Sequence, residues 1–119
     1  MKKTVVIGAT DNSQRYAYLA AHRLMEHSHP VVLVGIKPGS INNQPIYTDR
    51  PSIDEVDTVT LYVGPKNQPE WYDYILDLKP RRIIFNPGTE NLEFKQLARK
   101  AGIEAIEACT LVMLSIGNY

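Results

Sequence analysis

The sequence lacks the features that a disulfide-stapled or membrane-spanning protein needs. Cysteine occurs once, at Cys109, so no internal disulfide can form, which fits a reducing compartment. No apolar run approaches the roughly 20 residues that cross a bilayer. Met1-Lys2-Lys3 leads directly into a strand-like run, without the apolar segment of a secretory signal. We therefore expect a cytoplasmic protein with no membrane partner.

An excess of charge of either sign is also missing. The 13 Lys and Arg residues balance 13 Asp and Glu residues, and no long basic run occurs. Because nucleic-acid backbones select clustered positive charge, we expect no nucleic-acid partner. The single cysteine and the three clustered histidines, His22, His27 and His29, do not have the spacing of a zinc site. We therefore expect no bound metal.

The common nucleotide-binding motifs are absent or incomplete. The phosphate-loop pattern G-x-x-x-x-G-K-[ST] does not occur, which excludes a Walker-type site. The dinucleotide fingerprint G-x-G-x-x-G is present only at Gly8, because Thr10 and Ser13 occupy its second and third glycine positions. The 119 residues are enough for one domain with a real core, and we expect a single domain over residues 1–119.

Short apolar runs nevertheless give the chain a clear order of elements. Strands are predicted at Thr4–Ile7, at Val31–Val34 with Ile36 extending it, and at Thr58–Val63, Ile83–Phe85 and Ile103–Ile106. Helices are predicted up to His27, after Pro69, over Phe94–Ala101 and over Thr110–Ile116. Ser40–Pro51 is predicted to be an irregular connection with one candidate extended piece at Ile46-Tyr47, and the capping-box spacing of Ser52–Glu55 predicts one helical turn.

This order of elements predicts an α/β fold. We expect a single Rossmann-like open parallel five-stranded sheet, in the order 3-2-1-4-5, with helices on both faces and right-handed crossovers. In such sheets a ligand binds beyond the carboxyl ends of the strands, where the strand order reverses. The loops after the first four strands are therefore the candidate site.

The turn after the first strand has the chemistry of a phosphate site. Gly8 permits a tight turn, and Thr10, Asn12 and Ser13 offer polar side chains. The following helix directs its free N–H groups and positive dipole end at this turn, and Arg15 adds a fixed charge. The alternative is that Gly8 merely ends a strand and that Ser13 caps a helix with no ligand nearby.

The end of the second strand discriminates between ligands. NAD-binding domains usually carry Asp or Glu there to bind a ribose hydroxyl, whereas this chain has Lys37-Pro38. A lysine attracts a ribose phosphate, which points to coenzyme A (CoA) or NADP. The alternative is an ordinary solvated lysine at a strand end.

Taken together, six short motifs resemble those of the small stand-alone CoA-binding domain proteins, relatives of the N-terminal CoA-binding domain of succinyl-CoA ligase alpha subunits. The motifs are Val5–Thr10 with Arg15-Tyr16, Val34–Pro38, Pro45–Tyr47, Val63–Pro65, Asn86–Gly88 and Ala108–Leu114. Their order and spacing cover nearly the whole chain. The resemblance is therefore more specific than any one motif.

The resemblance implies a ligand and its contacts. It implies that the Gly8–Ser13 turn holds a pyrophosphate, that Lys37 lies near a phosphorylated ribose, that Val63–Pro65 borders adenine and that Asn86–Gly88 lies near the pantetheine arm. Thr10 departs from the ligase-type turn, which has a second glycine there and allows closer backbone approach. The candidate cofactor-binding residues are Gly8, Ala9, Thr10, Asn12, Ser13, Arg15, Tyr16, Lys37, Pro38, Val63, Pro65, Asn86, Pro87 and Gly88.

No catalytic residue is predicted. The ligase relatives react through a phosphorylated histidine in a further domain, for which this chain has no room, and Asp11, Glu90 and Cys109 have no identifiable catalytic partner. We expect a non-catalytic binding or regulatory module for CoA or acyl-CoA. The alternatives are an NADP-binding oxidoreductase-like protein and an interaction protein that has lost the ligand and uses its Tyr and Trp side chains on a partner. A homodimer through an outer helix is compatible with the sequence.

Overall fold

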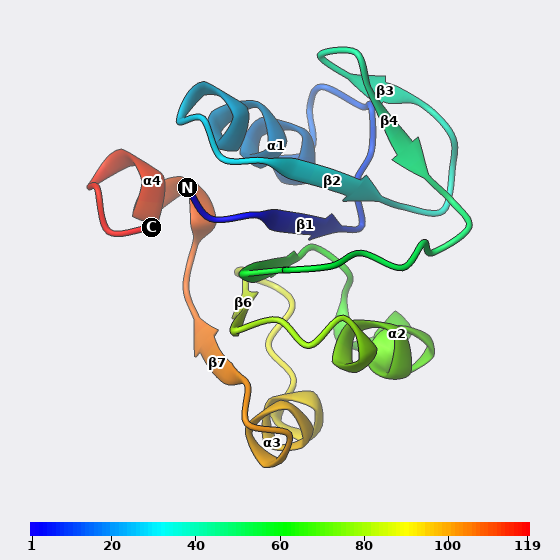
Figure 1. The fold of residues 1–119 in the computed structure, drawn as a ribbon, viewed down its shortest axis with the longest axis vertical. Helices are drawn as coiled ribbons and strands as arrows, with labels where there is room; N and C mark the ends of the chain where they lie inside the picture. The colour runs from blue at the N-terminus through cyan, green and yellow to red at the C-terminus, as the bar shows by residue number, and fades with distance from the viewer.

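The computed structural model describes residues 1–119 and alternates strands with helices (Figure 1). The elements are β1 (Thr4–Ile7), α1 (Tyr16–Glu26), β2 (Val31–Val34), β3 (Ser40–Ile41), β4 (Gln44–Tyr47), β5 (Thr58–Leu61), α2 (Tyr72–Asp77), β6 (Arg82–Phe85), α3 (Leu92–Lys100), β7 (Glu104–Glu107) and α4 (Thr110–Ser115). Two short 3-10 helices, η1 (Pro65–Asn67) and η2 (Pro69–Trp71), precede α2. The α/β class expected from the sequence is confirmed.

One mostly parallel sheet organises the molecule. Its seven strands follow the order β3-β4-β2-β1-β5-β6-β7, and only β3 and β4 pair in antiparallel fashion. Ile7, the last residue of β1, is in register with Val34 of β2 and Leu61 of β5. The carboxyl ends of the three central strands therefore meet at one edge of the sheet.

The predicted strand order 3-2-1-4-5 is wrong. The third predicted strand, β5, pairs with β1 on the side away from β2, so the five predicted strands have the order 2-1-3-4-5. All four residues of β5 are buried, which requires a neighbour on each side and a covering layer on each face. The chain leaves β1 to form β2 on one side of it and later forms β5 on its other side. The topological switch point therefore lies between β1 and β5.

The sheet has two more strands than predicted because the Ser40–Pro51 connection contains a hairpin. Asn42 and Asn43, both at positive φ, form its turn, and asparagine tolerates this conformation better than most residues. The candidate extended piece at Ile46-Tyr47 lies in β4, where Tyr47 pairs with Val34. The hairpin therefore covers the edge of β2, where the predicted order had placed the third strand.

The helical turn predicted at Ser52–Glu55 is absent. This segment has no helix, and Glu55 has a φ of 58°. Its backbone is tied to the sheet instead: Lys3 Nζ donates to the Asp54 carbonyl at 2.7 Å, and the Asp57 N–H donates to the Lys3 carbonyl at 2.9 Å. A capping box needs a following helix, and here the chain bends at Asp54-Glu55 and is bonded directly to the sheet before β5.

The two faces of the sheet carry separate cores, as the period of two along a strand requires. Val5 and Ile7 of β1 join a cluster of 15 buried residues under α2 and α3, whereas Val6 joins a cluster of 9 under α1. In α1 the buried residues are Ala17, Ala20, Ala21 and Leu24, and the small alanine side chains let this helix pack close to the sheet. The expectation of helices on both faces is confirmed.

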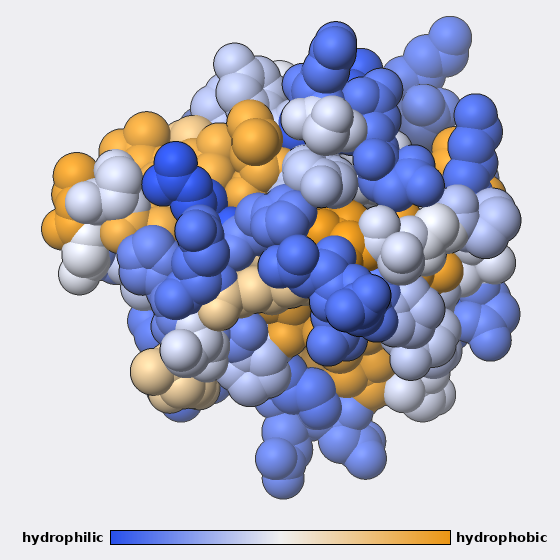
Figure 2. Space-filling view, turned by 90° about the horizontal axis from the view of Figure 1, so that it is seen from above, coloured by the Kyte–Doolittle hydropathy of each residue, from blue (hydrophilic) through white to orange (hydrophobic).

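Helix α4 lies at one end of the molecule and leaves part of its surface uncovered. Figure 2 shows apolar atoms gathered at the left, over α4, whose Val112 and Ile116 are 52% and 65% exposed. None of the helices is long and apolar enough to cross a bilayer.

Candidate functional site

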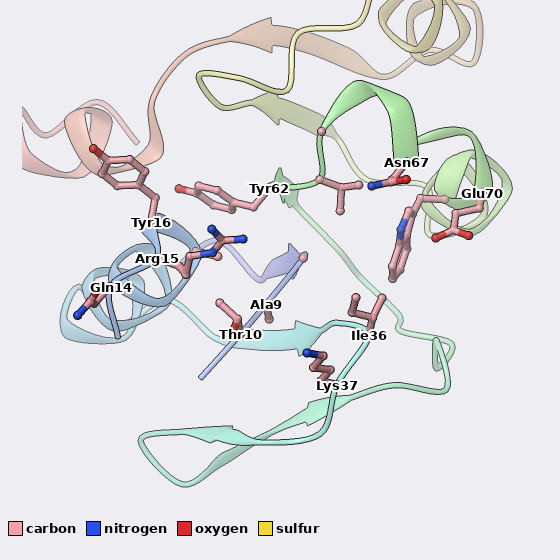
Figure 3. Close-up of a pocket in the computed structure, with 15 residues that line it drawn as sticks. Ala9, Thr10, Gln14, Arg15, Tyr16, Ile36, Lys37, Tyr62, Asn67 and Glu70 are labelled. Carbon is pink, nitrogen blue, oxygen red and sulfur yellow. The ribbon is translucent and has the colours of Figure 1, made fainter. Parts of the chain in front are cut away.

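A cleft of about 790 Å³ opens at the switch point between β1 and β5. It is lined by the turn after β1, the start of α1, the residues after β2 and β5, and the η1–η2 segment (Figure 3). Its volume is within the range of about 300–1,000 Å³ that is typical of small-molecule sites. This is the position at which an open α/β sheet binds its ligand.

Two glycines allow the loops of the cleft to approach each other closely. Gly8 has a φ of +90°, and a Cβ on it would lie 2.9 Å from the Tyr62 carbonyl oxygen and 3.2 Å from Val63 Cγ2. A Cβ on Gly35, just after β2, would collide with the carbonyl oxygen of Ala9. The N–H groups of Gly8 and Ala9 both donate to the Val34 carbonyl at 3.0 Å. The turn after β1 is thus held between the ends of β2 and β5.

The start of α1 supplies unused donors to this turn. The Asn12 side chain accepts from the Gln14 N–H at 3.0 Å and shapes the turn locally. The N–H groups of Tyr16 and Ala17, the first two residues of α1, donate to no protein atom, and both residues line the cleft. No side chain caps this helix. Free N–H groups at the positive end of a helix dipole favour an anion.

Two cations reach the cleft from different elements. Arg15 immediately precedes α1 and Lys37 follows β2, and Figure 3 shows their charged ends directed into the cavity from opposite sides. Neither side chain belongs to any of the ion pairs, which join Arg23 to Glu26, Arg50 to Glu70 and Lys95 to Glu107. Unpaired Arg and Lys side chains beside free helix N–H groups are suited to bind phosphate oxygens.

The wall opposite α1 is aromatic and apolar. Trp71 is only 2% exposed, yet it lines the cleft, and the Arg50 guanidinium lies 3.8 Å from the centroid of its ring. Arg50 also donates to the Glu70 carbonyl at 2.7 Å, which fixes the stack. Ile36, on the neighbouring loop, is 76% exposed. The exposed Ile36 offers apolar surface to a flat ring, whereas the indole, covered by Arg50, offers little.

Tyr62 lies between the cleft and the interior. Burial raises the pKa of its phenol well above the usual value. Tyr62 is therefore a neutral group at physiological pH and adds no negative charge that would oppose an anionic ligand.

The structure brings half of the predicted site residues together. Those that line the cleft are Gly8, Ala9, Thr10, Arg15, Tyr16, Lys37 and Val63. Asn12, Ser13, Pro38 and Pro65 belong to the same loops but are outside the lining, as are Asn86, Pro87 and Gly88.

Asn86 lies beneath the loops of the cleft. Its side chain is 1% exposed and donates from Nδ2 to Thr60 Oγ1 at 2.8 Å and to the Leu61 carbonyl at 2.9 Å. Its Oδ1 accepts from the Thr110 N–H at 2.9 Å. Asn86 thus joins β5 and β6 to the start of α4, and all of these contacts are made within the protein.

Sequence reasoning missed part of the lining, namely Gln14, Ala17, Ile36, Tyr62, Asn67, Glu70 and Trp71, and it included Gly64 only within the Val63–Pro65 loop. Tyr62 and Gly64 follow β5 directly, so the correct strand order would have placed them opposite the Gly8 turn. Trp71 shares the helical spacing of Ile75 and Leu78, and that spacing is the same for a core residue and for a cleft wall.

The other groups with reactive side chains are outside the lining of the cleft. Cys109 is half-buried at the start of α4, and Glu90 Oε1 accepts from the Gly88 N–H at 2.9 Å. Asp11 lies over Gly39, where a Cβ would be 2.6 Å from Asp11 Oδ2. No group of three or more His, Cys, Asp or Glu side chains is arranged to hold a metal ion.

The fold and the cleft together define a Rossmann-like α/β domain with a cleft at its switch point that unpaired cations line. Residues 2–115 match the family model described as a CoA binding domain. The chain therefore belongs to this CoA-binding domain family, as the resemblance implied. A CoA-related small-molecule ligand is indicated by this membership.

Solved structures share the fold. An uncharacterized protein of known crystal structure is 54% identical, with a TM-score of 0.98, and the match covers 100% of this chain and 98% of that chain. A hypothetical protein from Pyrococcus horikoshii OT3 is 25% identical, with a TM-score of 0.85 and coverage of 97% and 82%. A Thermus thermophilus protein, at 19% identity, a TM-score of 0.85 and coverage of 99% and 91%, shows the shared fold alone. No curated protein sequence matches the chain.

Proposed function

We propose that the chain binds CoA or acyl-CoA in the cleft between β1 and β5 and acts as a non-catalytic binding or regulatory module. The observation that carries the proposal is the pair of unpaired cations, Arg15 and Lys37, beside free N–H groups of α1 in a member of the CoA-binding domain family. CoA carries its negative charge on a pyrophosphate and on a ribose phosphate. Two separate cationic sites match that distribution.

The pyrophosphate is proposed to bind at the turn after β1. The N–H groups of Tyr16 and Ala17 and the dipole of α1 favour negative charge there. Arg15 adds a planar donor that can bind phosphate through two hydrogen bonds. The Thr10 hydroxyl accepts from the Asn12 N–H at 3.2 Å, so this side chain helps to shape the turn.

The ribose phosphate and the adenine are proposed to lie on the β2 and β5 sides of the cleft. Lys37 is the cation available to the phosphate, and its neighbour Ile36 lies with Val63 and Trp71 along the apolar part of the lining. A purine ring against the accessible side chains of Ile36 and Val63 would bury apolar surface. The resemblance puts the pantetheine arm near Asn86–Gly88, which is outside the lining, so the arm is proposed to extend beyond the cleft.

The lining of the cleft is suited to bind a ligand and has no pair of groups that would catalyse a reaction on it. The side chains that line the cleft are cations, neutral polar groups and apolar groups, with Glu70 as the one carboxylate. Glu70 is already paired with Arg50 at 3.7 Å. The lining thus offers contacts that recognise a ligand rather than a nucleophile held by a general base.

Titration calorimetry with CoA, acetyl-CoA, dephospho-CoA, NADP and NAD tests the proposal. We expect CoA to bind about 10-fold more tightly than dephospho-CoA, because a hydrogen bond to a charged group contributes about 1.5–3 kcal/mol and solvent screens part of it. NAD, which has no ribose phosphate, should bind no more tightly than dephospho-CoA.

Matched variants locate the effect. Lys37→Gln should weaken CoA binding to the level of dephospho-CoA and leave dephospho-CoA binding unchanged. Lys100→Gln removes the same charge from α3, outside the cleft lining, and should leave both affinities unchanged. Tighter binding of NADP than of CoA would favour the oxidoreductase-like alternative, and no binding of any of the five ligands would favour the interaction protein.

A further inference from the structure

Gln68 lies in an unusual place for a long polar side chain. It stands between η1 and η2 and is 0% exposed, whereas most glutamines lie on the surface. Asn67 before it and Glu70 and Trp71 after it line the cleft, but Gln68 itself does not. The residues on either side of Gln68 therefore face the cleft, while the carboxamide of Gln68 is buried behind them.

Every donor of this carboxamide is used within the protein. Nε2 donates to the Val63 carbonyl at 2.8 Å and to the Thr89 carbonyl at 2.7 Å, and Oε1 accepts from Asn91 Nδ2 at 2.9 Å. Both of its N–H groups are therefore satisfied by backbone carbonyls from two different loops. One side chain thus joins the loop after β5 to the loop after β6.

Val63, one of the residues that Gln68 binds, packs against the turn after β1 at Gly8. Val63 lines the cleft, and its Cγ2 lies 3.2 Å from the position that a Cβ on Gly8 would take. The Tyr62 carbonyl lies closer still to the same position, at 2.9 Å. A displacement of Val63 would therefore either press on the Gly8 turn or open a gap beside it.

The other end of the link is anchored in regular structure. Thr89 Oγ1 donates to the Asn86 carbonyl at 2.8 Å, and Asn86 is bonded to β5 and α4. Asn91 caps α3 by accepting from the Phe94 N–H at 3.2 Å. Gln68 thus links the cleft loop after β5, through Val63, to the buried hydrogen bonds of Thr89 and Asn91 after β6.

We infer that Gln68 is a positioning residue of the cleft, whose carboxamide holds the Val63–Asn67 wall in its binding geometry before a ligand arrives. Its effect on CoA affinity rests on the proposed function. A wall that is already ordered spares the ligand the entropy of ordering it, so affinity falls when the wall must be ordered during binding. The Asn86–Gly88 loop contributes to the site through the same link, from beneath.

The test compares Gln68→Met with Arg82→Met. Met fills a similar volume but gives the Val63 and Thr89 carbonyls no donor. Arg82 is also largely buried and hydrogen-bonded, at 2.8 Å to Thr58 Oγ1, but it begins β6 at the opposite edge of the sheet. At a temperature where both variants are folded, calorimetry should give an affinity for CoA that is about 10-fold lower for Gln68→Met, and unchanged for Arg82→Met.

Trp71, the only tryptophan, gives a readout that a purely stabilising role would not change. In free Gln68→Met its emission should shift to longer wavelength, and the amides of Val63–Asn67 should exchange hydrogen faster than in the wild type. Saturating CoA should restore the wild-type emission. If Gln68→Met fails to fold, Gln68→Leu removes the same donors and buries no polar group, and the same measurements apply.

The outcomes separate the two claims. Wild-type affinity, emission and amide exchange in a folded Gln68 variant would overturn the role of Gln68 and leave CoA binding intact. Failure of the wild type to bind CoA would overturn the proposed function, while the emission and exchange of the free variant would still decide whether Gln68 orders the wall.

Discussion

The two edges of the sheet use their cations in opposite ways. At the amino edge, Arg82 is 9% exposed, donates from Nε to Thr58 Oγ1 at 2.8 Å, and lies 4.5 Å from the ring centroid of Tyr119. The Tyr119 hydroxyl in turn lies 2.6 Å from Thr4 Oγ1. At the carboxyl edge, Arg15 and Lys37 have no protein partner at all. The first arrangement is suited to hold the fold together and the second to meet a ligand.

This difference follows from how strand ends are used in parallel sheets. Strands β1, β5 and β6 begin with Thr4, Thr58 and Arg82, all buried and polar, and Tyr119 packs over them. The ends of the same strands lead into the turns of the cleft, where free backbone donors remain. A cation with a partner in the fold therefore carries stability, and a cation without one is available for binding. Three predictions test this contrast.

The largest expected effect is on stability at the amino edge. Arg82→Met removes hydrogen bonds to Thr58 and to the main-chain oxygen of Tyr119 together with the stacking on the Tyr119 ring. We expect the free energy of unfolding to fall by about 2–3 kcal/mol. Urea unfolding followed by Trp71 fluorescence measures this loss. A loss below about 0.5 kcal/mol, the size of an ordinary surface substitution, would contradict the contrast.

At the carboxyl edge we expect a smaller effect, which changes the affinity for CoA and leaves the stability nearly unchanged. Arg15→Gln removes a cation that makes no ion pair within the protein, so the free energy of unfolding should change by no more than about 0.5 kcal/mol. Affinity for CoA should fall about 10-fold, because a charge-assisted contact to the pyrophosphate is lost. Calorimetry and urea unfolding on one preparation measure both. The matched control is Arg23→Gln, on the same helix but outside the cleft lining.

Five of the seven strands could be predicted from the sequence, but their order could not. Runs such as Thr4–Ile7 mark buried strands because each residue must suit an apolar environment, and that requirement is local. The order depends on which edge of β2 is free. The Asn42-Asn43 turn folds β3 and β4 back onto that edge, and this pairing between distant segments leaves no local signal strong enough to exclude the alternative.

The candidate site, like the sheet, could be predicted where its features are local in sequence and not where they depend on the fold. Gly8 and Lys37 were found because a glycine turn and a lysine at a strand end are local features. The helical spacing of Trp71 does not distinguish a core residue from a cleft wall, and Trp71 is both, since it lines the cleft and is almost fully buried. The role of Gln68 could not be predicted, because its partners at Val63, Thr89 and Asn91 meet only after the sheet has formed.

The smallest expected effect is a pH dependence that belongs to the amino edge alone. Burial is the main cause that lowers the pKa of His29 below its ordinary value of 6.5, and neighbouring positive charges, Lys2 among them, lower it further. His29 Nδ1 accepts from the Lys2 N–H at 3.0 Å, which requires the neutral ring. The folded protein thus binds this proton less readily than the unfolded chain does, so the stabilisation is fully present above about pH 6.5 and is lost as the pH falls toward the lower folded-state pKa.

We expect this loss to be below about 1 kcal/mol, because solvent reaches part of the ring and screens its interactions. Urea unfolding at a series of pH values from about 8 to 5 measures it. His29→Gln should flatten this part of the profile, whereas His22→Gln, on α1 and away from Lys2, should leave it unchanged. Affinity for CoA, measured for wild type and His29→Gln over the same range, should show no difference between them, because His29 is at the edge opposite the cleft. A difference in affinity would mean that the two edges are coupled, and the division between a stabilising edge and a binding edge would then be wrong.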